Sequence, residues 1–247
     1  MAFDDNGVCA PVKTEKTYLS GTAADQPVSP SDLPVVSVAV FLPAGFEDQE
    51  VATVLDVLGW ASYRADTAQV KVTTCGFASL AKGAFGTQVA VDQLLGGMDP
   101  AEFACDHAAL VVPGGFHNLG FDQAYCEPVY QLVRAFRALG KPIATFCVGS
   151  VLVANAGVLK GGRATTYALS SHHDNMGALR AGGCTPVEEG GFVEWDGILS
   201  CSGPEFAQQT AERLLEILLG EQATSRIKAL RRGGVPRSGE SASKPAR

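Results

Sequence analysis

The stretch PIATFCVGSVLVANAGV, residues 142–158, decides the fold, because a short apolar run ends at a cysteine and a second run rich in small residues follows at once. Residues 142–146 predict a buried strand and residues 148–158 predict a helix. A sharp strand-to-helix turn presents its central side chain, here Cys147, at the carboxyl end of the strand. The N-terminus of the helix adds backbone N–H groups and positive potential, which favour a thiolate. Cys147 is therefore the candidate nucleophile.

Two apolar runs outside this stretch, residues 35–42 and 108–112, predict parallel strands buried on both faces. Each is followed by a glycine-containing turn and then by a helical pattern. The apolar residues of these two helices recur at spacings of three and four: Val51, Val54, Leu55, Leu58 and Val129, Leu132, Val133, Phe136. Strands that alternate with helices predict an α/β fold with a mostly parallel central sheet and helices on both faces.

The remaining pattern completes one domain. It predicts strands at 70–75 and 87–91 (the second as an edge strand or hairpin arm), an extended segment at 164–166, a helix at 171–179, strands at 187–195 and 198–201, and a helix at 205–219. The organisation expected is a flexible N-terminal arm over residues 1–33, an α/β domain over 34–230 and a flexible basic tail over 231–247.

Composition and charge exclude several classes of protein. The 247 residues are 46% hydrophobic and 18% charged, which is typical of a globular chain. The net charge of -7 argues against nucleic acid as the main partner. No apolar run reaches about 18 residues, so no membrane span is expected. The first twenty residues lack the positive start and apolar core of a signal peptide, which predicts a cytoplasmic protein.

The cysteines and histidines do not form a metal-binding pattern. Seven cysteines and four histidines are present, without a CxxC pair and without zinc-finger spacing. A cytosolic chain usually keeps its cysteines as thiols, either buried or catalytic. We therefore expect no metal site.

Two other predicted strands end in segments that suit a site, because sites in open parallel sheets lie at the carboxyl ends of strands. The strand at 108–112 runs into Pro113-Gly114-Gly115, where the absence of side chains lets backbone N–H groups approach a ligand, as an oxyanion hole requires. The strand at 35–42 is followed by Glu47 at a helix start. A carboxylate that stabilises the helix dipole is the alternative reading of Glu47, and Asp48 and Glu50 suit that role equally well.

Taken together, the motifs resemble the ThiJ/PfpI superfamily over about residues 35–230. The motifs that carry this resemblance are Gly45-Phe46-Glu47-Asp48-Gln49-Glu50, Val112-Pro113-Gly114-Gly115, the Cys147 turn, Gly162-Arg163-Ala164-Thr165-Thr166, and residues 193–204. The resemblance implies a flavodoxin-like sandwich with Cys147 as nucleophile and Glu47 as its paired acid. It also implies an oxyanion site made by the backbones of Gly115 and Val148, beside Gly114.

Details of the motifs point to a branch of that superfamily. Protease-type members carry a histidine directly after the nucleophile, where this chain has Val148. The continuation resembles the parkinsonism-associated deglycase and glyoxalase-III-like branch, or the isonitrile hydratases. Deglycase-type members often have a histidine after the paired threonines, where this chain has Tyr167. His117, His172 and His173 are the other candidates for a third site residue.

The resemblance implies a cofactor-independent, cysteine-dependent enzyme that acts on small reactive carbonyls such as methylglyoxal. A redox-sensing protein with an oxidisable Cys147 is one alternative, and another thiolate hydrolase or hydratase, for example one acting on an isonitrile, is the second. The partners expected are a small carbonyl substrate and a second copy of the chain, with neither nucleic acid nor membrane.

Overall fold

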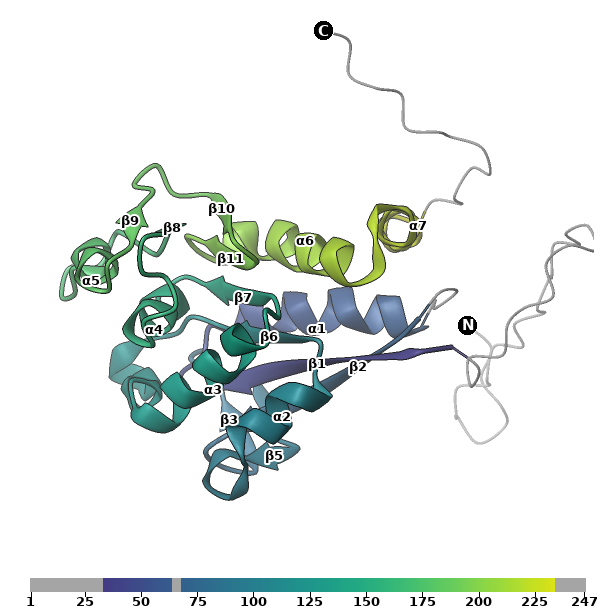
Figure 1. Cartoon of the computed structure of the whole chain (residues 1–247), viewed down its shortest axis with the longest axis horizontal. Coiled ribbons are helices and arrows are strands. Elements are labelled where there is room, and N and C mark those ends of the chain that lie inside the picture. Colours follow the sequence, from purple (N-terminus) through teal and green to yellow (C-terminus); the bar gives the residue numbers. More distant parts are fainter. Residues whose placement is uncertain (1–32, 64–67, 234–247) are drawn as a thin grey trace, which may run out of the picture.

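A seven-stranded sheet runs through the centre of the computed structural model, which describes residues 33–63 and 68–233 (Figure 1). Its strands, in spatial order, are β10 (Phe192–Trp195), β11 (Ile198–Cys201), β7 (Ile143–Phe146), β6 (Ala109–Val112), β1 (Val35–Leu42), β2 (Gln69–Gly76) and β5 (Gln93–Leu94). Every pairing is parallel except that of β10 with β11. The predicted arm at 1–33 lies almost wholly outside the described residues, as does most of the predicted tail at 231–247.

Helices cover both faces of this sheet (Figure 1). One face carries α1 (Asp48–Tyr63), α6 (Ala207–Leu219) and α7 (Glu221–Arg231). The other carries α2 (Pro100–Asp106), α3 (Glu127–Ala138), α4 (Gly149–Asn155) and α5 (Asn175–Ala181). Alternate residues of β1 enter the two cores, because successive side chains of a strand point to opposite faces. The layers therefore follow from continuous apolar strands placed between amphipathic helices.

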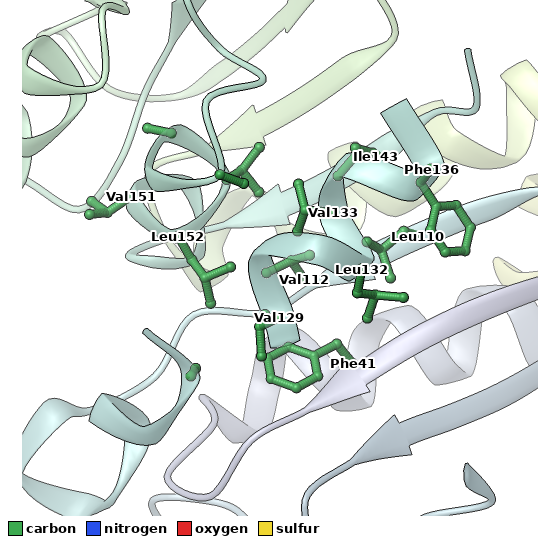
Figure 2. Packing of buried hydrophobic residues seen from close by; sticks show 14 of the residues in the cluster. Phe41, Leu110, Val112, Val129, Leu132, Val133, Phe136, Ile143, Val151 and Leu152 are labelled. Carbon is green, nitrogen blue, oxygen red and sulfur yellow. The ribbon is translucent and has the colours of Figure 1, made fainter. Parts of the chain in front are cut away.

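The core under α3 shows how the predicted helical stripe is used. Val129, Leu132, Val133 and Phe136 are fully buried, and they point down onto the central strands, next to Leu110 of β6 (Figure 2). Burying a side chain of this size stabilises a fold by roughly 1.5–3 kcal/mol. The stripe thereby fixes α3 over the strands whose ends carry the candidate site.

Most predicted elements are present, and two were misplaced. The segment at 87–91 forms β4 (Gln88–Ala90), which pairs with β3 (Leu80–Lys82) as a hairpin. The helix predicted at 171–179 begins only at Asn175, because Asp174 caps its first turn by accepting from the N–H of Gly177. The strand predicted from 187 begins at Phe192, after Gly190 and Gly191, which both have positive φ.

Among the described residues, no helix has both the length and the apolar character needed to cross a membrane.

Candidate active site

The turn between β7 and α4 holds Cys147 in the left-handed region, with φ +49°. Its N–H donates to the Cys201 carbonyl at 2.8 Å, and its own carbonyl accepts from the Thr166 hydroxyl at 2.8 Å. Non-glycine residues with positive φ are uncommon and persist where the surroundings hold them in place. Only 8% of Cys147 is exposed. The sharp turn predicted from the sequence is therefore present, and its cysteine lies beneath the surface.

A carboxyl group from the first turn of α1, that of Glu50, reaches the same space. Glu50 is fully buried, and its Oε2 accepts from the Gly114 N–H at 2.7 Å. A Cβ placed on Gly114 would lie 2.4 Å from the Cys147 Cβ and 3.0 Å from Glu50 Oε2, so Gly114 separates the two side chains by only a few ångströms. Glu50 Oε1 is buried without a hydrogen-bond partner in the described part of the chain. The carboxyl of Glu50 thus lies beside Cys147, and its charge raises the pKa of the thiol more than that of Glu47 does.

Glu47, the acid implied by the sequence resemblance, has a different local role. Its carbonyl accepts the first helical bond of α1, from Val51, and its Oε2 accepts from the Glu50 N–H at 2.7 Å. These are the bonds of a residue that caps a helix N-terminus. Burial raises the pKa of Glu47, and the N–H groups of Glu50 and Gln49 oppose this. The geometry places the capping carboxylate at Glu47 and the acid beside Cys147 at Glu50; a chemical role for Glu47 stays a prediction.

The predicted oxyanion donor Gly115 lies on a loop that backbone hydrogen bonds join to the loop before α1, whereas Val148 lies on the turn between β7 and α4. The N–H of Glu47 donates to the Gly114 carbonyl at 3.0 Å, and the N–H of Phe116 donates to the Gly45 carbonyl at 2.8 Å. Gly115, between these bonds, pairs with Phe46 in an isolated antiparallel bridge in which its own N–H stays outside the ladder. The N–H of Gly114, by contrast, is already used by Glu50.

The electrostatics of the cysteine and the glutamate are coupled. Burial raises the pKa of Glu50 to about 8, and the Gly114 N–H opposes this. Burial also raises the pKa of Cys147 well above its ordinary value; the negative charge of Glu50 raises it further, and the N–H of Val148 lowers it. Since two negative charges so close are disfavoured, the ionised form of one group requires the other to be neutral. The N–H at the helix start thus favours a Cys147 thiolate, whereas burial and a charged Glu50 oppose it, so the thiolate is paired with a protonated Glu50.

Two of the predicted histidines meet beside this centre. The rings of His117 and His173 stack with centroids 4.1 Å apart and planes 21° apart. Nε2 of His117 lies 3.2 Å from the hydroxyl of Tyr125, and that hydroxyl lies 3.4 Å from the Val148 carbonyl oxygen. Burial lowers the pKa of His117, and His173 lowers it further, whereas Asp122 raises it.

These rings line a pocket of about 380 Å³. Its lining consists of His117, Asp122, Tyr125, Val151, His172, His173, Asp174, Asn175 and Ala178. Tyr167 is 39% exposed, and its carbonyl, not its phenol, takes part in the loop by accepting from Asn175 at 2.8 Å. The structure therefore brings His117, His172 and His173 to one pocket and leaves Tyr167 outside its lining. Over residues 33–63 and 68–233, no three His, Cys, Asp or Glu side chains are grouped so that they could hold a metal ion.

Two residues of the site were not selected from the sequence. Glu50 was read as an ordinary first-turn carboxylate, although its position one helical turn after Glu47 indicates that the two side chains project from the same end of the helix. Tyr125 lies just after the short helix Phe121–Ala124, in a segment without periodicity. No local signal could have selected Tyr125, because its neighbours in the site come from distant parts of the chain.

Comparison with known proteins places the chain in a family. The model of the DJ-1/PfpI family matches residues 36–217. An uncharacterized protein of Methanocaldococcus jannaschii is 23% identical over 169 residues, which is 68% of this chain and 75% of that protein. Deglycase PfpI of Pyrococcus furiosus is 36% identical over 85 residues, which is 34% of this chain and 48% of the deglycase.

Solved structures show the same fold. The crystal structure of Drosophila melanogaster DJ-1beta matches with a TM-score of 0.65 at 24% identity, over 81% of this chain and 99% of that one. Schizosaccharomyces pombe DJ-1 matches with a TM-score of 0.65 at 20% identity, over 79% and 98%. The expected flavodoxin-like architecture is thereby confirmed. The chain, with its strand-to-helix turn at Cys147 and a family match over most of its described residues, belongs to the DJ-1/PfpI family.

Proposed function

We propose that the chain is a cofactor-independent, cysteine-dependent enzyme that acts on small reactive carbonyls, with a glyoxalase-III-like or deglycase-like reaction. The observation that carries this proposal is the buried carboxyl of Glu50 beside Cys147, on a turn that holds the cysteine at φ +49°. Such a pair can form a nucleophile and a proton donor from one shared proton. A deglycase among the relatives, similar over part of its length, supports the same choice.

In the first step the Cys147 sulfur adds to the aldehyde carbon of a 2-oxoaldehyde. A carbon–sulfur bond forms, the carbonyl π electrons move to oxygen, and the oxygen takes the proton held by Glu50, which gives a hemithioacetal. The N–H groups of Gly115 and Val148 are the donors proposed to stabilise the oxyanion on the way. Glu50 is left as a carboxylate and is then able to act as a base.

In the second step the Glu50 carboxylate moves a proton from the former aldehyde carbon to the neighbouring carbonyl carbon, and the hydroxyl proton of the hemithioacetal passes to the neighbouring carbonyl oxygen. The first carbon is oxidised to a thioester and the second is reduced to an alcohol, so no external oxidant is needed. Water then hydrolyses the thioester and releases a 2-hydroxy acid and the Cys147 thiol. For methylglyoxal the sum is addition of one water to give lactate. Deglycation would begin from the same kind of carbonyl adduct.

The test is incubation of the purified chain with methylglyoxal, without glutathione, and measurement of lactate. Cys147→Ser should abolish lactate formation, and Glu50→Gln should reduce kcat by about 10²–10⁴, the usual contribution of a general acid–base group. Glu47→Gln is the matched control, because it alters a neighbouring carboxylate that caps the helix. A large loss in Glu47→Gln with little loss in Glu50→Gln would return the acid to Glu47.

Failure to form lactate with wild-type protein would refute the carbonyl reaction. A panel containing an isonitrile would then test the hydratase alternative. Mass spectrometry of Cys147 after mild peroxide treatment would test the sensor alternative, since a sensor requires oxidation of the thiol and no turnover.

A further inference from the structure

A short chain of contacts connects the stacked histidines to the nucleophile. His117 Nε2 meets the Tyr125 hydroxyl at 3.2 Å, and this hydroxyl meets the Val148 carbonyl at 3.4 Å. The His117 and Tyr125 rings are stacked and nearly parallel, with 6° between their planes and 5.5 Å between centroids. Val148 is the residue that follows Cys147 and begins the turn into α4. The phenol of Tyr125 thus lies between a titratable ring and the backbone of the nucleophile turn.

We propose that Tyr125 is a positioning residue that makes the reactivity of Cys147 depend on the protonation of His117. The proposal rests on the proposed function only in taking Cys147 as the reactive group. Tyr125 has a single hydroxyl hydrogen and two acceptors within reach, so it donates to one of them at a time. The charge state of His117 decides which acceptor it uses.

When His117 is cationic, both ring nitrogens carry hydrogen, so Nε2 donates to the phenol oxygen. The Tyr125 hydroxyl then donates to the Val148 carbonyl. This bond holds Val148 in place, and the N–H of Val148 faces the Cys147 sulfur. When His117 is neutral with hydrogen on Nδ1, Tyr125 donates to Nε2 and the bond to Val148 is lost. Protonated His117 thus stabilises the Val148 position and, through its N–H, the thiolate.

The groups that face His117 determine the pH at which it loses its proton. His173 stacks on the ring, and Asp122 lies 4.0 Å from Nε2. Tyr125 is on the third side, and His172 and Asp174 line the same pocket. Burial raises the pKa of the Tyr125 phenol, and the charge of Cys147 raises it further, which keeps Tyr125 protonated and able to donate. His173 lowers the pKa of His117 and Asp122 raises it. Removal of His173 should therefore raise this pKa, and removal of Asp122 should lower it.

The experiment measures the rate at which iodoacetamide alkylates Cys147 from pH 5 to 9, with peptide mapping to separate it from the other cysteines. In the wild-type protein the rate profile should contain a step below pH 6.5, on the acidic side of the main thiol titration. At this step the rate should fall, relative to that titration, as His117 loses its proton. The size expected is about fivefold, typical of one net hydrogen bond. Tyr125→Phe should abolish the step. His173→Ala should move it to higher pH, and Asp122→Asn to lower pH.

Tyr130→Phe is the matched control, because its hydroxyl belongs to α3 and contacts Asn155 outside the pocket lining; it should keep the step. His117→Gln provides a second removal of the titration if Tyr125→Phe fails to fold. A step that persists in both Tyr125→Phe and His117→Gln, or that moves the same way in His173→Ala and Asp122→Asn, overturns the proposal. Alkylation needs no turnover, so absence of lactate would refute the proposed function without affecting this result.

Discussion

Replacing Glu50 by Gln should change the pH dependence of stability in a specific way. A carboxyl whose pKa rises from 4.5 to about 8 on folding binds its proton more tightly in the folded state. Unfolding between these values releases a proton, so stability is greatest below pH 4.5 and falls as the pH rises toward 8. At about 1.4 kcal/mol per tenfold change in proton affinity, the cost is about 3 kcal/mol at pH 7 and about 5 kcal/mol above pH 8.

Glutamine removes this titration but introduces a different cost. It can still accept from the Gly114 N–H, as Glu50 does at 2.7 Å. Its NH₂ group would occupy the place of Oε1, which has no partner among the described residues, and an unpaired buried donor costs about 1–3 kcal/mol. We therefore expect Glu50→Gln to be less stable than wild type near pH 4.5 and more stable near pH 8, with the two curves crossing between.

The assay is urea denaturation of both proteins at intervals from pH 4.5 to 8.5, with the free energy of unfolding compared at each pH. Titrating groups that do not interact with Glu50 are common to both chains and cancel in the difference, whereas Glu47 and Cys147 interact with Glu50 and contribute to it. Glu102→Gln, an exposed glutamate in the first turn of α2, is the control and should follow wild type. Parallel curves for wild type and Glu50→Gln would refute the conclusion that Glu50 is a buried, raised-pKa acid.

Three further outcomes follow from the site. Gly114→Ala should lower the free energy of unfolding by about 1–3 kcal/mol and slow Cys147 alkylation, because the new Cβ would lie 2.4 Å from the Cys147 Cβ. Gly96→Ala is the control and should do neither, because its Cβ would have no atom within 4 Å. Glu47→Ala should cost about 1 kcal/mol in denaturant unfolding through loss of the helix cap, and a loss near zero would contradict that role. Tyr167→Phe should reduce methylglyoxal turnover less than about tenfold, below the general-base range, and a loss equal to that of Cys147→Ser would make Tyr167 a central group.

The fold was predictable from the sequence where apolar periodicity is strong. The continuous run of β1 and the stripe of α3 each require burial on defined faces, and both elements are present. The start of α5 was not predictable, because Asp174 ends a loop by capping a helix and its neighbours His172 and His173 have no periodicity. The short helix α2 was also missed, since its seven residues are too few to display a pattern.

The site was predictable at the position fixed by local turn geometry, which is Cys147. The choice between Glu47 and Glu50 depended on which carboxyl meets the loop at Gly114, and this is a contact between residues 64 positions apart. Tyr125 and His117 were assembled by the same kind of long-range packing. Local sequence therefore selects the cysteine of the turn, while tertiary contacts select the groups that surround it.

Two backbone hydrogen bonds join residues 45–47 to residues 114–116, so one side of the candidate site is held more firmly than the other. On that side, a change in one loop is transmitted to the other, because both loops follow central strands and are hydrogen-bonded to each other. On the opposite side, the segment from Tyr167 to Asp174 has no regular secondary structure, and Leu169 within it is 84% exposed. Residues of that segment can therefore be exchanged with less effect on the packing around Cys147 than residues of the two tied loops.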